Sequence, residues 1–339
     1  MLSIPLGDGS GRSRVGLGCT SFSHGYRPVQ QDEKESVRVI HRALELGIRV
    51  FDTADVYGPY SNEQLLGRAL RDRRECAVIA TKCGLVTRPN GKLGRNGRPG
   101  HIRSACEDSL TRLQTDVIDL YQLHRVDPEV PLEETWGAMA DLVRAGKVRG
   151  LGISHASVEE LELLHAQFPV SAVQYELSVW ARYALDDVLP WCETHGIPFL
   201  AFSPLGRGFL TGYVDRTTLG DEDLRARDPR FTEQALVANH TIVDGLAVVA
   251  RRLGVTTAQV SLAWVLAQSD LVVPIPATKR LRWLEQNAAA ADLGLSTEDL
   301  DDLARLPEAV GRMRWDLRVP DPCPPAATAG GRGPVEERA

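Results

Sequence analysis

Several features that mark particular classes of protein are missing from this 339-residue chain. No apolar run approaches the roughly 18 residues that are needed to span a bilayer. The N-terminal segment MLSIPLGDGSGRSR lacks the apolar stretch of a secretory signal. The six cysteines form no C-x-x-C pair and show no zinc-binding spacing. We therefore expect a cytoplasmic protein with reduced cysteines, no membrane segment and no metal site.

Lysine is also scarce, and acidic residues slightly outnumber basic ones. The chain has 39 Lys and Arg against 45 Asp and Glu, a formal net charge of −6 and a pI of about 5.8. This balance gives no general attraction for nucleic acid or anionic membranes. Most of the basic residues are arginines, so a lysine inside an apolar run, such as Lys82, is informative. The expected partner is a small molecule, and nothing in the sequence indicates an oligomeric state.

Short apolar runs alternate with longer amphipathic ones along the chain. The first amphipathic run, Lys34–Leu46, predicts a helix that ends at Gly47. Each interval between apolar runs is long enough for the helical crossover that joins parallel strands. The eight predicted strands are Val15–Gly18, Arg49–Thr53, Val78–Thr81, Val117–Gln122, Val148–Ser154, Ala172–Tyr175, Pro198–Phe202 and Val272–Ile275.

Eight strand–helix repeats fit either an open doubly wound sheet or a closed barrel. The open dinucleotide-binding fold should carry G-x-G-x-x-G after its first strand. Here GLGCTS lacks the third glycine, and GDGSG precedes any good strand. The sequence therefore predicts an α/β TIM (β/α)8 barrel, with residues 1–319 as a single domain. Extra helices are expected at Glu233–Leu253 and Glu298–Leu306, and a disordered Pro/Gly/Ala-rich tail at 320–339.

Ionisable residues stand at the carboxyl ends of consecutive predicted strands, where TIM barrels hold their active sites. Asp52, Lys82 and His124 end strands two, three and four, and Tyr57 lies five residues after Asp52. Each has an ordinary structural interpretation when taken alone. The aspartate could cap a turn, the tyrosine and histidine could pack, and the lysine could reach solvent. Their occurrence together at one end of the barrel indicates a catalytic site.

These four side chains have complementary chemistry. Asp52 can keep the Lys82 ammonium charged in a partly dry site, and Lys82 can favour the ionised form of Tyr57. Tyr57 is then a better proton donor to a carbonyl oxygen that is gaining charge. His124 can donate a second hydrogen bond to that oxygen. The set suits carbonyl reduction, provided that a source of hydride lies opposite.

The motifs, taken in order, resemble those of the aldo-keto reductase superfamily. The resemblance runs from about Val15 to Asn287 and is closest to bacterial and plant members whose first motif reads GLGC-x-x-x-S. It implies that Tyr57, as general acid, forms a catalytic tetrad with the three residues above. The matching segments are GLGCTSFSHGY, FDTADVYGPYSNEQLLGRAL, ATKCG, DLYQLHRVD, VRGLGIS, AVQYELSVW, FSPLGRGFLTG and PIPATKRLRWLEQN.

The resemblance also implies a cofactor, NADPH or NADP+, extended across the barrel mouth without a Rossmann domain. Ser154 and Gln174 match residues that hold the nicotinamide carboxamide, and Phe202 stands where a tyrosine often stacks on that ring. Lys279 and Arg280 match the segment that meets the 2′-phosphate. The other expected cofactor residues are Gly18, Cys19, Thr20 and Asp52, Ser203, Leu205 and Gly206 near the pyrophosphate, and Gln286 and Asn287 near the adenine.

The chain departs from the family pattern at two further positions. His155 stands where members often have asparagine, which puts one amide contact in doubt. Trp283 stands where an arginine is often found, so phosphate recognition would depend more on Lys279 and Arg280. The expected walls of the substrate pocket, with room for a flat or cyclic substrate, are Phe22, Tyr26, Tyr60, His155 and Trp180.

Three functions remain open from the sequence. The first is reduction of a small aldehyde or ketone to an alcohol. The second is an NADPH-binding regulatory subunit with little turnover, like the potassium-channel β subunits of the family. Those subunits lack the histidine that matches His124, which favours an enzyme here. The third is reduction of a nucleotide-sugar intermediate.

Overall fold

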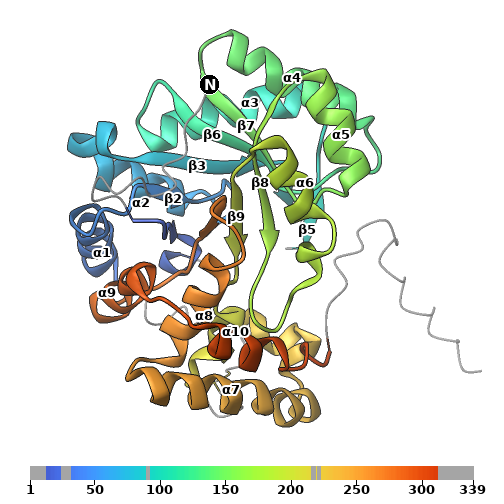
Figure 1. Ribbon diagram of the computed structural model, residues 1–339. Helices are drawn as coiled ribbons and strands as arrows, with labels where there is room; N and C mark the ends of the chain where they lie inside the picture. The colour runs from blue at the N-terminus through green and yellow to red at the C-terminus, as the bar shows by residue number, and fades with distance from the viewer. Residues whose placement is uncertain (1–12, 24–31, 89–91, 215–218, 220–222, 312–339) are drawn as a thin grey trace, which may run out of the picture.

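Eight parallel strands form the centre of the molecule in the computed structural model, which describes residues 13–23, 32–88, 92–214, 219 and 223–311 (Figure 1). Their order around the sheet is β1-β2-β3-β6-β7-β8-β9-β10. The predicted tail at 320–339 and the predicted pocket residue Tyr26 lie outside the described residues. The strands are β1 (Leu17–Gly18), β2 (Val50–Asp52), β3 (Val78–Cys83), β6 (Ile118–Leu123), β7 (Val148–Ser154), β8 (Val170–Glu176), β9 (Phe199–Phe202) and β10 (Val272–Pro274).

Backbone hydrogen bonds join the first strand to the last. Gly16 N donates to Pro274 O at 2.9 Å and Gly18 N donates to Pro276 O at 3.1 Å. A Cβ on Gly18 would lie 2.7 Å from the Ile275 oxygen, so this close approach requires glycine. These contacts bring the two edges of the sheet together. The (β/α)8 barrel predicted from the sequence is confirmed.

The barrel interior is built in layers by the two-residue period of its strands. One apolar layer consists of Val50, Ala80, Leu120, Ala172, Leu200 and Val273, one residue from each of six strands. Side chains two residues further along a strand point to the same side. The next layer toward the carboxyl ends therefore contains Asp52, Lys82, Gln122 and Gln174, each two residues beyond a member of the apolar layer. Polar residues thus replace the apolar core where the barrel opens.

In the described part of the chain, one α-helix of the barrel follows each strand, and two further α-helices lie outside this repeat. The extra helices are α7 (Glu233–Leu253) and α10 (Thr297–Ala304), which the sequence predicted. Arg252 of α7 ties them together through Glu298 at 3.0 Å and Asp302 at 2.6 Å. The barrel helices are α1 (Glu33–Glu45), α2 (Ser61–Leu70), α3 (Pro99–Leu113), α4 (Leu132–Arg144), α5 (Val158–Gln167), α6 (Val188–His195), α8 (Thr257–Leu266) and α9 (Leu281–Ala289).

An antiparallel hairpin that was not predicted lies between β3 and α3. It pairs β4 (Leu85–Thr87) with β5 (Leu93–Arg95). The sequence between the two strands contains the dipeptide Asn90-Gly91, which strongly favours hairpins and was a signal for this element. The hairpin brings Arg95 toward the segment that follows β6, because Arg95 Nη1 donates to Val126 O at 3.3 Å.

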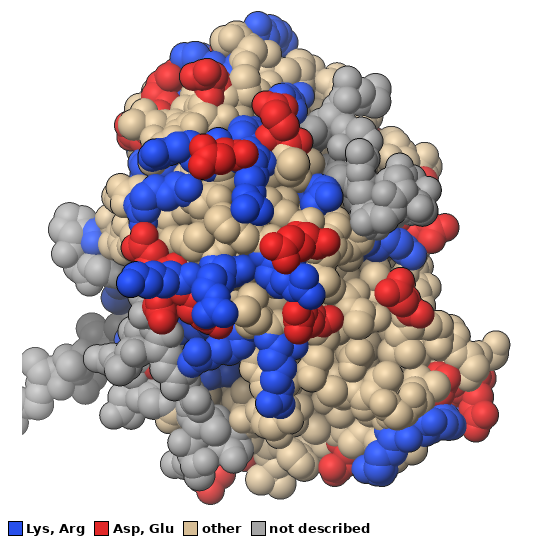
Figure 2. Space-filling view, turned by 90° about the vertical axis from the view of Figure 1, so that its left-hand side faces the viewer, with Lys and Arg blue, Asp and Glu red and all other residues tan. Residues whose placement is uncertain are grey.

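Charges of both signs are interleaved on the side of the molecule that carries α1, α2 and α9 (Figure 2). Ion pairs connect these helices. Arg42 of α1 lies 2.9 Å from Glu285 of α9, and Arg68 of α2 lies 2.6 Å from Glu33 of α1. Exposed pairs of this kind contribute about 0–1 kcal/mol each. Among the described helices, none is both long and apolar enough to cross a membrane.

Candidate active site

A buried ion pair lies at the carboxyl end of the barrel. Lys82 Nζ is 2.5 Å from Asp52 Oδ1 and also donates to Thr53 O at 2.8 Å. Lys82 is completely buried and Asp52 is 3% exposed. Burial alone would lower the pKa of Lys82, but the nearby Asp52 and Tyr57 more than offset it and raise that pKa. The lysine therefore remains a cation although it is buried.

Two glutamines hold the other oxygen of the same carboxylate. Gln174 Nε2 donates to Asp52 Oδ2 at 2.7 Å, and Gln122 Nε2 donates to it at 3.2 Å. The two amides also meet, with Gln174 Nε2 at 3.3 Å from Gln122 Oε1. Gln122 was not singled out in the sequence, although it lies two residues before His124 and therefore shares its side of the strand. The network fixes the orientation of Asp52.

Tyr57 and His124 complete the group of four predicted catalytic side chains. The Tyr57 ring centroid is 5.2 Å from Lys82 Nζ and 5.9 Å from the His124 ring, which stands nearly perpendicular to it. Tyr57 is half-buried in the loop between β2 and α2, and His124 is buried immediately after β6. The hydroxyl and the imidazole lie at the same end of the barrel as the ion pair. Two possible proton donors and one cation thus meet in one place.

A buried asparagine ties the loop that carries Tyr57 to its surroundings. Asn62 Oδ1 accepts from Thr53 Oγ1 at 2.7 Å, and its amide nitrogen donates to Cys19 O at 2.9 Å and Ser23 Oγ at 2.6 Å. Its backbone N–H donates to Tyr57 O at 3.3 Å. Asn62 could not be recognised from the sequence, because its importance comes from contacts that are distant in the chain.

A second carboxyl group, Asp55, lies buried in the same loop. Its backbone N–H donates to Lys82 O at 3.2 Å, which attaches the loop to β3. Burial, together with the nearby Glu63 carboxylate, raises the pKa of Asp55 to about 7. Glu63 itself accepts hydrogen bonds from Thr81 Oγ1 and Arg112 Nε, both at 2.6 Å. The fold therefore disfavours the ionised form of Asp55.

We expect Asp55→Asn to stabilise the protein increasingly as the pH rises. An unfolded aspartate ionises near pH 3.9, whereas folded Asp55 holds its proton to about pH 7. Wild type therefore loses stability between these values, and the uncharged amide does not. The free-energy advantage of the variant in urea unfolding should grow by at least about 1.4 kcal/mol from pH 4.5 to pH 8, which corresponds to a tenfold change in proton affinity. A constant difference across this range would contradict the interpretation.

The residues expected at the nicotinamide end lie beside the tetrad. Ser154, buried at the end of β7, pairs in register with Gln174 of β8. The Phe202 ring, half-buried at the end of β9, is 5.1 Å from the His155 ring. Burial, with the nearby Arg125 and Arg207 cations, lowers the pKa of His155 well below its ordinary value. His155 is therefore a neutral imidazole at neutral pH.

The turn after β9 carries the segment expected near the pyrophosphate. Ser203 and Gly206 have φ values of 50° and 55°, and Gly206 N donates to Ser203 O at 2.9 Å. A Cβ on Gly206 would lie 2.7 Å from the Trp180 ring, so the turn needs glycine both for conformation and for space. Leu205 is buried between them.

The basic segment expected at the 2′-phosphate follows β10, the strand that closes the barrel beside β1. Gly18 of β1 forms a parallel bridge with Ala277, two residues before Lys279. Arg280 precedes α9, whose N-terminus has no side-chain cap and no acidic residue in its first turn. The positive end of that helix and two basic side chains therefore favour an anion.

The remaining predicted cofactor residues lie in the same two regions. Cys19 is buried after β1, and burial together with Asp52 raises the pKa of its thiol. Thr20 follows in a short 3-10 turn. Gln286 and Asn287 lie on α9, the second of them buried.

The predicted pocket walls differ in their surroundings. Phe22 is buried near the end of β1, while Tyr60 is 52% exposed with Arg112 4.7 Å from its ring centroid. Trp180 is buried in the hydrophobic core and stacks on Phe209 at 5.2 Å. Of the other predicted pocket walls, His155 lies beside Phe202, and Trp180 packs against the turn at Gly206.

Arg125 is a cation at this site that the sequence analysis did not single out. It follows His124 directly, and its Nη1 donates to His124 O at 2.6 Å and to Ser154 Oγ at 2.9 Å. Burial lowers its pKa to about 10, so it stays charged at neutral pH. The only available signal was its position next to His124 in the segment DLYQLHRVD.

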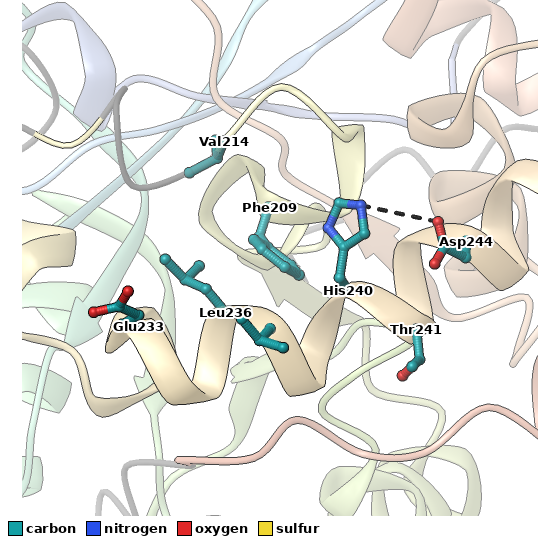
Figure 3. A pocket seen from close by; sticks show the side chains of 8 residues that line it. Phe209, Val214, Glu233, Leu236, His240, Thr241 and Asp244 are labelled. Carbon is teal, nitrogen blue, oxygen red and sulfur yellow. Dashed lines mark ion pairs between the residues drawn. The ribbon is translucent and has the colours of Figure 1, made fainter.

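A separate groove of about 550 Å³ lies along α7 (Figure 3). Its lining comes from α7 and from the 209–214 segment, and His240 Nε2 lies 3.9 Å from Asp244 Oδ1 in it. None of the tetrad lines it. Within the described ranges, no group of three or more His, Cys, Asp or Glu side chains is arranged to hold a metal ion. The groove is lined by Phe209, Val214, Glu233, Leu236, Val237, His240, Thr241 and Asp244.

Comparison with known proteins places this arrangement in a family. The model of the Aldo/keto reductase family matches residues 14–308. A probable aldo-keto reductase 1 from Glycine max is 41% identical over 293 residues, which cover 86% of this chain and 84% of that protein.

Solved structures agree with the sequence match. A glycerol dehydrogenase, AKR11B4, from Gluconobacter oxydans is 33% identical, with a TM-score of 0.78 over 86% of this chain and 91% of that one. An aldo-keto reductase from Klebsiella pneumoniae, solved in complex with NADPH, is 30% identical, with a TM-score of 0.69 over 91% of this chain and 96% of that one. The chain therefore belongs to the aldo/keto reductase family of oxidoreductases.

Proposed function

We propose that this enzyme reduces an aldehyde or ketone to an alcohol, with NADPH as the hydride donor and Tyr57 as the general acid. The observation that carries the proposal is the meeting of Tyr57 and His124 with the buried Asp52–Lys82 pair at the barrel mouth. Family membership supports carbonyl reduction in general, and the NADPH complex of the Klebsiella pneumoniae relative supports this cofactor.

The donor groups at the mouth fit a long ligand with an amide at one end and a phosphate at the other. Ser154 supplies a hydroxyl, and Gln174 uses its amide nitrogen on Asp52, so its oxygen is the atom suited to accept from a carboxamide. Lys279 and Arg280 stand before the uncapped N-terminus of α9, where a phosphate would be stabilised. The Ser154–Gln174 end would hold the nicotinamide, and the basic end would hold the 2′-phosphate.

Each tetrad member has a role that follows from its surroundings. The Tyr57 hydroxyl donates a proton to the carbonyl oxygen as that oxygen gains charge. Lys82 compensates the negative charge left on the phenol, and Asp52 holds Lys82 in place. His124 donates a hydrogen bond to the same oxygen. When bound, NADPH supplies the hydride.

The direct test is turnover of a reactive aldehyde. We expect the purified protein to oxidise NADPH when 4-nitrobenzaldehyde is added and to form the corresponding alcohol in equal amount. Loss of NADPH absorbance measures oxidation of the cofactor, and chromatography measures the alcohol that is formed. Tight NADPH binding without turnover across a broad panel of carbonyl compounds would instead favour the regulatory subunit.

Cofactor preference should depend on Lys279 and Arg280. A 2′-phosphate gains charge-assisted hydrogen bonds from them, each contributing about 1.5–3 kcal/mol. After allowance for solvent exposure, we expect wild type to bind NADPH roughly 10²-fold more tightly than NADH. The double variant Lys279→Ala/Arg280→Ala should lose most of this preference while NADH binding stays nearly the same.

Fluorescence titration with both cofactors measures this preference. Arg103→Ala, a change to an exposed arginine on α3 that pairs with Asp141, is the matched control and should bind both cofactors as wild type does. Equal losses for NADPH and NADH in the double variant would mean that the two basic residues support the segment and do not recognise the phosphate.

A further inference from the structure

The main chain is strained in the turn that is expected near the pyrophosphate. Ser203, Gly206, Arg207 and Gly208 all have positive φ, between 50° and 92°, and two of the four are not glycine. A residue with a Cβ is disfavoured in this left-handed region by roughly 5–30-fold. Because the conformation is costly, contacts from the rest of the fold must hold it in place.

The segment before α7 binds both the side chain and the main chain of Arg207. Arg207 Nη1 lies 3.3 Å from Asp228 Oδ2, and the Asp228 side chain is fully buried. The backbone oxygen of Arg207 accepts a hydrogen bond from Arg225 Nη1 at 3.1 Å. Arg207, one of the two strained residues that are not glycine, is therefore fixed from two directions.

Arg230 connects Asp228 to the barrel. Arg230 Nε and Nη2 donate to the Asp228 carboxylate at 3.2 Å and 2.9 Å, and Arg230 Nη1 donates to Glu176 Oε1 at 2.6 Å. Glu176 ends β8 and pairs in register with Phe202, the residue immediately before the turn. Glu176, Asp228 and Arg230 are each only 2% exposed. A buried row of alternating charges thus runs from the end of β8 to Arg207.

Arg230 reaches the turn by a second route, through an aromatic ring. Its Cζ lies 5.1 Å from the centroid of the Trp180 ring, and a Cβ on Gly206 would lie 2.7 Å from the same ring. Phe209, which follows the turn in the chain, stacks on this ring at 5.2 Å. A buried network of ion pairs and hydrogen bonds makes its surroundings rigid. Arg230 is therefore placed to make the turn rigid.

We propose that Arg230 is a positioning residue for the cofactor, which acts through Asp228 and Arg207 to hold the turn in the conformation that binds the pyrophosphate. This assignment rests on the part of the proposed function that places NADPH across the barrel mouth. Because Arg230 acts through its neighbours, it should determine how tightly the cofactor binds and leave proton transfer from Tyr57 unchanged.

Two small residues at position 207 test whether the row of charges holds the turn. Arg207→Ala breaks the ion pair with Asp228 and keeps the strain, so NADPH should bind about 5–30-fold more weakly, the cost of a left-handed conformation that nothing offsets. Arg207→Gly breaks the same pair but adopts positive φ freely, so it should retain most of the wild-type affinity. Fluorescence titration measures both. Equal affinities in the two variants, whether weakened or not, would overturn the proposal, because strain at Arg207 would then have no bearing on binding.

Arg230→Met tests Arg230 itself with two ligands. NADPH carries a pyrophosphate, whereas adenosine 2′,5′-bisphosphate carries the adenine and the 2′-phosphate without one. We expect NADPH to bind at least about tenfold more weakly and the bisphosphate to bind as it does to wild type. Equal losses for the two ligands would mean that Arg230 supports the whole fold, and an unchanged affinity for NADPH would remove it from cofactor binding. Either result would overturn the positioning role.

Two related variants keep the test decisive if Arg230→Met does not fold. Arg230→Lys keeps the charge without the planar fork, so its affinity for NADPH should lie between those of wild type and Arg230→Met. Asp228→Asn breaks the row at its next member and should weaken NADPH and spare the bisphosphate in the same way. Wild-type affinity for NADPH in Asp228→Asn would overturn the proposal.

Two further measurements separate positioning from a general loss of stability. With saturating NADPH, single-turnover reduction of 4-nitrobenzaldehyde should proceed at the wild-type rate in each variant, because the tetrad is unchanged. Arg74→Ala, in which the buried Asp119 loses an arginine at the opposite end of the barrel, should bind both ligands as wild type does. A slowed single turnover in Arg230→Met would place its effect in the chemical step and overturn the assignment.

Cofactor binding and aldehyde reduction can fail separately. A wild-type protein that bound NADPH but reduced no aldehyde would overturn the proposed reductase activity alone, and cofactor binding would still decide the role of Arg230. An affinity for NADPH that was weak in wild type and the same in every variant would overturn the placement of the cofactor on this turn, and the role of Arg230 with it.

Discussion

Tyr57→Phe is expected to lower kcat by about 10²–10⁴ while NADPH binding stays nearly unchanged. The substitution removes the hydroxyl that donates the proton and keeps the ring, which lies 5.2 Å from Lys82 Nζ and 5.9 Å from the His124 ring. Because the ring still fills its place, the buried ion pair should keep its geometry. The substitution should therefore slow the chemical step and leave both folding and cofactor binding nearly unchanged.

Single-turnover kinetics with excess enzyme and NADPH isolates that step. Tyr121→Phe is a matched control, since Tyr121 is a buried tyrosine on β6 that neighbours Gln122 and faces the opposite side of the strand. The control should retain the wild-type rate. A less than tenfold loss in Tyr57→Phe, under conditions where chemistry limits turnover, would assign the proton to another donor.

The barrel could be predicted because the two-residue period of its strands and the longer period of its helices are both visible in the sequence. Side chains two positions apart on a strand point to the same side of the sheet. The inward-facing Val50 therefore predicts that Asp52 points inward, and Ala80 predicts the same for Lys82. The helices between them show the longer period, and α7 has the predicted bounds, Glu233–Leu253. Local patterns determine these features, and a single sequence displays local patterns.

Features that depend on distant contacts could not be predicted in the same way. Asn62 is polar and ordinary in the sequence, yet it is fully buried and connects the Tyr57 loop with Cys19 and Ser23. Asp55 looks like any loop aspartate until Glu63 is found close by. The place of Arg125 in the site could not be recognised without knowing that Ser154 lies within hydrogen-bond distance of it. In each case the chemistry comes from partners that the fold supplies.

How deeply a side chain is buried could not be predicted from the sequence either. Trp180, expected at the pocket wall, lies in the core with its ring against Phe209 and with Arg230 5.1 Å from its centroid. An aromatic residue after a strand can line a pocket or fill the space beneath a turn. Gly206 packs closely on the Trp180 ring, which places this ring beneath the turn. The two residues are 26 positions apart in the chain, so local sequence does not reveal the contact.

Lys82→Met should reduce both stability and rate, and the two losses have different causes. The stability loss comes from Asp52. Its Oδ2 keeps the amides of Gln174 and Gln122, but its Oδ1 loses the cation at 2.5 Å. Breaking a buried pair in this way costs about 3–5 kcal/mol, because the remaining charge is uncompensated. Urea unfolding should show a loss of this size.

The rate loss comes from the missing positive charge beside Tyr57. Removing one electrostatic stabiliser of a developing charge costs about 10²–10³ in kcat. Arg74→Met separates this effect from a general loss of stability. Arg74 pairs at 2.6 Å with Asp119, near the amino end of β6 and so at the opposite end of the barrel. That control should lose stability and retain kcat while folded.

The double variant Lys82→Met/Asp52→Asn completes the test. Replacing the carboxylate by an amide removes the uncompensated charge, so a substantial part of the lost stability should return. Activity should not return with it, because neither substitution restores a cation near the Tyr57 ring. Recovery of both stability and rate in the double variant would mean that Lys82 serves only to neutralise Asp52. Wild-type activity in Lys82→Met alone would remove the lysine from the proposed mechanism altogether.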